Sequence, residues 1–172
     1  MVAVNAEGTG VSDQEAGLLA ASLVSGGWES AAGALAAFAY LTLTTIQDGT
    51  SLYARLCAEP ALIPTAVDEL LRVAPNSVFG ATQPRRVARD VQLGDVLVRA
   101  GELLIPSPHL AFGSGAHICV GAHLARLELQ IALQQLTQRL PSLRLATAPE
   151  NLRGRWDASV IRRPDTLPVT WN

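Results

Sequence analysis

Cysteine and charged residues are both scarce in this chain of 172 residues. The two cysteines, Cys57 and Cys119, are too few for a disulfide framework, so a reducing, cytoplasmic location is the simplest expectation. Charged residues make up 16% of the chain and the formal net charge is −2, which gives no reason to expect binding to nucleic acid or to an anionic membrane surface. The first ten residues lack the basic and apolar regions of a secretory signal.

Hydrophobic residues, by contrast, make up 49% of the chain, which excludes a disordered protein. Charge is nearly absent from residues 16–46, where Glu29 is the one charged residue. Such a stretch can be a membrane span, and this alternative remains open, although a carboxylate at its centre would be costly. A helix that is apolar all round is equally typical of the buried central helix of a large globular protein, and we favour that interpretation.

Local patterns predict the other elements. Ser12 and Glu15 form a capping box that starts a central helix over 12–46, with a weak point at Gly26 and Gly27. The remaining elements are expected to be helices over roughly 50–58, 64–74 and 119–140, a β region over 85–107, a glycine-rich loop over 109–121, and strands and loops over 141–172. The pattern therefore predicts one mainly α domain with small β-sheets over 1–172.

Two helices carry predicted apolar faces, which we expect to be buried. The face of helix 64–74 consists of Ala66, Leu70 and Val73, and that of helix 119–140 consists of Leu124, Leu127, Ile131 and Leu136.

The three histidines lie close to Cys119, which raises the question of a metal. A zinc site usually has four ligands with paired spacings, whereas His109, His117 and His123 accompany a single thiol, so zinc is a minor alternative. A haem iron needs only one thiolate on its proximal side, and glycines before Cys119 would let the backbone approach a flat porphyrin. Cys57 has no such surroundings and is interpreted as a buried structural cysteine.

Three motifs in order resemble the cytochrome P450 family, in its soluble actinobacterial form. "FGSGAHICVG" (112–121) is similar to the family's cysteine-ligand loop, "ELLR" (69–72) to its Glu-x-x-Arg helix, and "SGGWES" (25–30) to its central-helix motif. The resemblance covers almost the whole chain. It implies the C-terminal portion of the P450 fold: central helix, Glu-x-x-Arg helix, short strands, cysteine loop and following helix.

The resemblance implies a role for each matching residue. Cys119 would be the axial thiolate ligand of the iron of haem b, and Glu29 with Ser30 would deliver protons to bound oxygen. The residues that would shape the two sides of the haem site are Gly26 and Gly27 over the iron, and Phe112, Gly113, Gly115 and Gly121 in the loop.

The resemblance also implies polar residues that would bind the haem propionates, and an ion pair that would stabilise the fold. His117, His109 and Arg85 match positions near the haem propionates; we choose Arg85 over Arg86 because it lies five residues before Asp90. Glu69 and Arg72 would form a buried structural pair, although an exposed helix pair is the commoner arrangement from sequence alone. His123 is expected on a helix surface.

The chain departs from the family in two places. The N-terminal half of the family has no counterpart, and an internal deletion falls at the Ser107–Pro108 junction before the cysteine loop. The resemblance implies a monooxygenase that uses O2 and electrons from a ferredoxin-type partner to hydroxylate a small organic molecule, without nucleic acid or membrane. The alternatives are a non-catalytic truncated remnant, or one half of a split P450 whose N-terminal half lies on another chain; a membrane or zinc-binding protein is a minor one.

Overall fold

The computed structural model describes residues 10–74, 85–104, 111–155 and 161–172. Its helices are α1 (Asp13–Thr44), α2 (Leu52–Ala58), α3 (Ile63–Val73) and α4 (Ala122–Arg139), with short 3-10 turns η1 (Pro60–Leu62), η2 (Gly115–His117) and η3 (Pro149–Asn151). The strands pair antiparallel in twos: β1 (Ile46–Gln47) with β2 (Thr50–Ser51), β3 (Arg85–Arg86) with β6 (Leu103–Leu104), β4 (Val91–Leu93) with β5 (Val96–Val98), and β7 (Arg144–Leu145) with β8 (Val169–Thr170).

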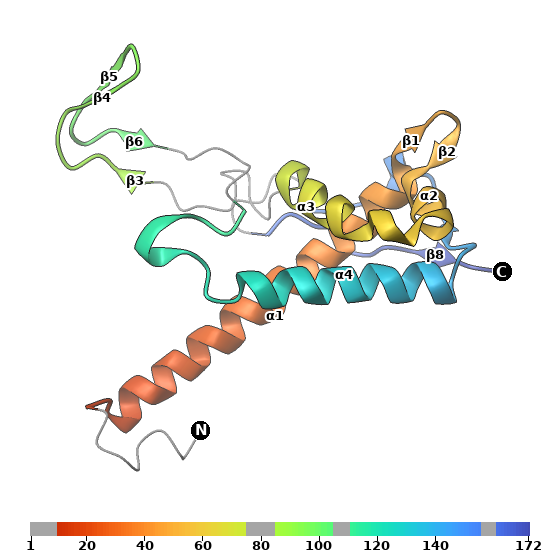
Figure 1. Cartoon of the computed structure of the whole chain (residues 1–172), viewed down its shortest axis with the longest axis horizontal. Helices are drawn as coiled ribbons and strands as arrows, with labels where there is room; N and C mark the ends of the chain where they lie inside the picture. Colours follow the sequence, from red (N-terminus) through yellow and green to blue (C-terminus); the bar gives the residue numbers. More distant parts are fainter. Residues whose placement is uncertain (1–9, 75–84, 105–110, 156–160) are drawn as a thin grey trace.

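The hydrophobic core lies where the C-terminal half of α1 meets α2, α3 and α4 (Figure 1). Its members are Ala34, Phe38, Leu56, Ile63, Val67, Leu70, Leu129 and Leu133. Burying a side chain of this kind contributes about 1.5–3 kcal/mol. Two buried threonines, Thr42 and Thr137, donate their hydroxyls to carbonyls four residues back in their own helices, which avoids an unpaired polar group in the core.

Helix α1 starts with the predicted capping box. The Ser12 hydroxyl accepts the Glu15 amide at 3.3 Å, and the Glu15 carboxylate accepts the Ser12 amide at 2.8 Å. Hydrogen bonds from the Ser12 amide and the Ser12 hydroxyl to the Glu15 carboxylate hold the pKa of Glu15 below its ordinary value. The helix continues through Gly26 and Gly27, where an added Cβ at either position would meet open space. The predicted weak point therefore does not interrupt the helix.

The N-terminal half of α1 extends away from the other helices (Figure 1). Its large apolar side chains are exposed: Leu18, Leu19, Leu23, Val24 and Trp28. At 100° per residue these positions are spread around the helix rather than gathered on one face. No helix within the described residues has the length and hydropathy needed to cross a membrane.

Helix α4 buries a different face from the predicted one. Of the predicted face, Leu124, Leu127 and Ile131 are 60%, 52% and 48% exposed and Leu136 is partly buried, whereas the buried positions are Ala122, Leu129, Leu133 and Thr137. The exposed and the buried positions lie on opposite sides of the helix. The prediction chose the stripe with the larger side chains, but the neighbouring helices pack against the other one.

Helix α3 shows a smaller error of the same kind. It buries Ile63, Val67 and Leu70, while Val73 is 49% exposed and Ala66 is partly buried. The β region over 85–104 and the paired strands at 144–145 and 169–170 agree with the sequence pattern. Gly94, at φ 57°, makes the tight turn between β4 and β5.

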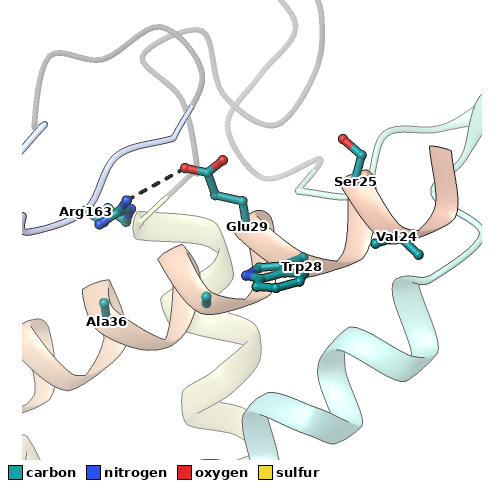
Figure 2. A pocket seen from close by; sticks show the side chains of 7 residues that line it. Val24, Ser25, Trp28, Glu29, Ala36 and Arg163 are labelled. Atoms are coloured by element: carbon teal, nitrogen blue, oxygen red, sulfur yellow. Dashed lines mark ion pairs between the residues drawn. The ribbon is translucent and has the colours of Figure 1, made fainter. Parts of the chain in front are cut away.

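The C-terminal segment returns to α1. An added Cβ on Gly33 of α1 would lie 2.6 Å from Cγ2 of Ile161, so the segment approaches the helix backbone directly at this residue. Arg163, two residues further on, lies against the same helix (Figure 2). This contact places a charged residue of the tail beside the central-helix motif at 25–30.

Candidate functional site

The loop before α4 closes on itself through backbone hydrogen bonds. The Cys119 amide donates to the Phe112 carbonyl at 2.9 Å, and the Ile118 amide donates to the Gly115 carbonyl at 3.1 Å. Gly113 and Gly115 have φ angles of 73° and 78°, a region that other residues rarely adopt. The two glycines therefore let the backbone turn sharply within the short segment between Phe112 and Cys119.

Cys119 is held at the entrance of α4 with its side chain exposed. Its carbonyl accepts the Ala122 amide at 3.2 Å, and Gly121 is the N-cap of the helix. A Cβ on Gly121 would lie 3.9 Å from the sulfur, in ordinary contact. The flanking Ile118 and Val120 are 57% and 85% exposed, so exposed apolar side chains stand on both sides of Cys119 in the sequence.

The central-helix motif lines an open pocket of about 560 Å³ (Figure 2). Its lining residues are Val24, Ser25, Trp28, Glu29, Ala32, Ala36 and Arg163. The Glu29 carboxylate forms an ion pair with Arg163 at 3.7 Å, and the Ser30 hydroxyl donates to the Gly26 carbonyl one turn back. The pocket thus combines an apolar helix surface, an indole and one pair of opposite charges.

The predicted propionate ligands lie in two other segments. His117 is exposed in η2, and Arg85 is exposed in β3. Arg86 donates to the Gly101 carbonyl at 2.8 Å; because neighbouring side chains of a strand point to opposite faces, Arg85 points away from that turn. His109 and the Ser107–Pro108 junction lie outside the described residues.

Glu69 and Arg72 form the predicted pair, but not in the predicted environment. Two hydrogen bonds of 2.6 and 2.7 Å join the carboxylate and the guanidinium. The side chains are 57% and 55% exposed, so the expectation of a buried pair is wrong. The i, i+3 spacing sets the contact, whereas burial needs polypeptide packed over this face of α3. The hydrogen bond from Arg72 lowers the pKa of Glu69, and the same bond raises the pKa of Arg72.

Comparison with known proteins assigns this arrangement to a family. A sequence model described as "Cytochrome P450" matches residues 105–166. Over 94% of this chain, nocardicin C N-oxygenase of Nocardia uniformis subsp. tsuyamanensis is 41% identical, and mycinamicin IV hydroxylase/epoxidase of Micromonospora griseorubida is 39% identical. The chain belongs to the cytochrome P450 family.

Solved P450 structures match the fold as well as the sequence. The mixed-function P450 MycG superposes on 94% of this chain with a TM-score of 0.80 and 38% identity, and CYP105P1 in complex with filipin I on 98% with a TM-score of 0.82 and 35% identity. This chain spans 46% of each of those chains, and 45% of each of the two curated relatives.

The alignment to the nocardicin enzyme covers 185 positions, more than the 172 residues of this chain. That relative therefore carries residues within the matched region that this P450 lacks.

P450 membership implies haem with a cysteine thiolate as axial ligand, and the loop fits that group. Cys119 is a free thiol with an exposed side chain, at the start of a helix whose N-terminus favours an anion. The exposed Ile118 and Val120, on either side of Cys119 in the sequence, offer apolar surface to a flat ring, and the glycine-rich loop is closed by backbone hydrogen bonds. Cys57 differs: it is partly buried, and burial raises the pKa of its thiol.

The zinc alternative named His109, His117 and His123 beside Cys119, and His109 lies outside the described residues. Among the described residues, no group of three or more His, Cys, Asp and Glu side chains gathers in one place.

Sequence reasoning missed two charged residues at the site. Arg163 reaches Glu29 from 134 positions along the chain, and no local pattern predicts that contact. Arg126 is the second, and its guanidinium lies 4.6 Å from the centre of the Phe112 ring. No sequence pattern predicts the contact between Arg126 and Phe112, because Phe112 belongs to the loop and Arg126 to the second turn of α4. The contact forms only when the loop packs on the helix.

Proposed function

We propose that this chain is the iron-binding part of a cytoplasmic haem-thiolate monooxygenase that uses O2 to oxidise a small organic molecule. The observation that supports the proposal most directly is the closed loop that presents the exposed Cys119 thiol at the start of α4. The named activities of the relatives, an N-oxygenase and a hydroxylase/epoxidase, point to the same reaction class. Haem with a thiolate ligand, when bound, supplies oxygen-activating chemistry and takes electrons from a redox partner, which we expect to be a ferredoxin-type protein.

The residues proposed for the site would act on two opposite faces of the haem. Cys119 would hold the iron on the loop side, and His117 and Arg85 would bind the acidic edge of the haem. On the α1 side, Gly26 and Gly27 leave open space above their backbone. Glu29 and Ser30 would pass protons toward that space, since an exposed carboxylate can take a proton from solvent and hand it to a neighbouring hydroxyl.

The proposal also includes packing of this chain against polypeptide that corresponds to the rest of the P450 fold. The apolar side chains on the N-terminal half of α1, together with Leu124, Leu127 and Ile131 of α4, are exposed here. Exposed apolar surface of this extent marks an interaction site. We infer that these faces receive the polypeptide that makes up the other part of the relatives, either in the same protein or on a second chain.

A carbon monoxide spectrum tests the proposal. The chain is expressed with a haem supply, reduced, and exposed to carbon monoxide; a red-shifted Soret band of the thiolate type is expected. Cys119→Ala should abolish the band, and Cys57→Ala, the matched control, should keep it. A band that survives Cys119→Ala would contradict the assignment of the ligand.

A second candidate, a non-catalytic remnant, is favoured by one observation. The Glu29 side chain is 54% exposed and the pocket beside it is open, so water would reach the oxygen side in this chain by itself. Product formation separates the two candidates. A chain that shows the thiolate spectrum but reduces O2 only to peroxide, with or without added N-terminal P450 polypeptide, would support the remnant.

A further inference from the structure

One arginine side chain joins three segments around the cysteine loop. Arg126, in α4, donates from Nε to the Asp68 carboxylate of α3 at 3.0 Å. The same guanidinium lies over the ring of Phe112 at the start of the loop, 4.6 Å from the ring centre. Arg126 therefore ties the loop to both α3 and α4.

The contact with Phe112 reaches Cys119 in one further step. The carbonyl of Phe112 accepts the Cys119 amide at 2.9 Å, so the position of Phe112 sets the position of the backbone that carries the thiol. Glycines at 113 and 115 give the loop conformational freedom and no packing of their own. The Phe112 ring is the large side chain at the start of this loop, and Arg126 lies against it.

The chemistry of arginine suits both contacts at once. A guanidinium is planar, so its face can lie on an aromatic ring while its edge donates hydrogen bonds to a carboxylate. Asp68 holds the group from the side of α3, which keeps it over the ring. The arginine side chain is 39% exposed, so part of it is shielded from water, which strengthens its interaction with the ring.

We propose that Arg126 is a positioning residue for Cys119, acting through the Phe112 ring and held in place by Asp68. The consequence for haem ligation rests on the proposed function. The effect on the loop itself does not, because it belongs to the chain without haem.

Amide hydrogen exchange at Cys119 measures the effect directly. In the full chain without haem, Arg126→Gln should speed exchange of the Cys119 amide by about tenfold, the change expected for loss of an interaction of this class. Arg126→Lys should give a smaller increase, because an ammonium keeps the charge but not the planar fork. Arg139→Gln, in the last turn of the same helix, is the matched control and should leave the rate unchanged.

A double variant separates positioning from general loosening. Phe112→Leu should raise Cys119 exchange by a similar factor, and adding Arg126→Gln to it should change the rate no further, because the two act in series. Exchange of the Leu140 amide, at the far end of α4, reports helix stability and should be the same in all variants. Additive effects, or equal acceleration at Leu140, would show a merely structural role and overturn the proposal.

Haem loading then distinguishes this inference from the proposed function. If Cys119 binds the iron, Arg126→Gln should convert part of the carbon monoxide complex to a band without the thiolate red shift, and Arg139→Gln should not. If the unmodified chain shows no thiolate band at all, the proposed function fails while the exchange result still decides the role of Arg126. Unchanged exchange in Arg126→Gln refutes the positioning role whatever the spectrum shows.

Discussion

At the scale of single residues, Tyr53 shows how burial sets a chemical property. Its side chain is fully buried in α2, and its hydroxyl donates to the Leu140 carbonyl at the end of α4, 3.0 Å away. Burial, with a smaller contribution from Cys57, raises the pKa of Tyr53 to about 12. The phenol therefore stays neutral in the folded chain over a pH range in which the unfolded chain ionises.

Tyr53→Phe should change both the stability and its dependence on pH. The lost hydrogen bond should lower the free energy of unfolding by about 1 kcal/mol at pH 7. Between about pH 10 and 12 the unfolded state binds fewer protons than the folded state, so the unmodified chain should lose up to about 2 kcal/mol as pH rises.

The phenylalanine variant should lack this loss. Urea unfolding from pH 8 to 11.5, in a Cys57→Ser background, measures both slopes. Equal slopes in the two proteins would contradict the pKa argument.

At the scale of elements, the glycines of α1 fall into two groups. Gly33 faces the C-terminal segment, where an added Cβ would lie 2.6 Å from Ile161, whereas Gly17, Gly26 and Gly27 face open space. Alanine is favoured over glycine in a helix by about 1 kcal/mol, so the outcome of a substitution depends on what the new methyl group meets.

Gly33→Ala and Gly17→Ala should therefore have opposite effects. Gly17→Ala should raise the free energy of unfolding by about 0.5–1 kcal/mol, because the helix gains propensity without a clash. Gly33→Ala should lower it by about 1–2 kcal/mol, because the methyl group displaces residues 161–163. Thermal unfolding followed by circular dichroism measures both; stabilisation by Gly33→Ala would mean that the tail does not pack on α1.

Gly27→Ala should separate stability from function. Without haem the substitution should stabilise α1 by about 0.5–1 kcal/mol, as at Gly17. If the space over Gly27 receives oxygen, the same variant should weaken the carbon monoxide complex while Gly17→Ala leaves it unchanged. The measurement is a carbon monoxide titration of the reduced protein; equal affinities in both variants would place the oxygen side elsewhere.

At the scale of the whole molecule, two of the described helices leave large apolar side chains uncovered. Leu18, Leu23 and Trp28 of α1 are 62%, 52% and 76% exposed, and Leu124 and Leu127 of α4 are 60% and 52% exposed. Apolar surface of this kind is typical of one that packs against further polypeptide. It agrees with a chain that spans 45% of its curated relatives.

Charge placed on these helices should reduce self-association. Leu23→Glu combined with Leu127→Glu is expected to shift the chain toward a monomer in sedimentation velocity, at little cost to folding because both positions are half exposed or more. Gln14→Glu with Gln138→Glu adds the same charge at exposed polar positions and is the matched control. If the control shifts the chain equally, net charge rather than the apolar faces governs association.

Local chemistry let the sequence predict much of this protein. The capping box, the spacing of Glu69 and Arg72, the glycines around Cys119 and the paired strands all act between residues near in sequence or through simple alternation. Two of the family motifs, the Glu-x-x-Arg helix and the cysteine loop, lie in these same segments, so the resemblance to the family could be recognised from the sequence.

Only the tertiary structure decided which surfaces are covered. Helix α4 has apolar residues on two opposite sides, and nothing within the helix tells which one α1 and α3 pack against. The exposure of the Glu69–Arg72 pair, the Arg163 contact with Glu29 and the Arg126 contacts with Phe112 and Asp68 depend on segments that meet only after folding. Which side chains are buried and which distant residues pair depend on how the whole chain packs, so the periodicity of one element does not predict them.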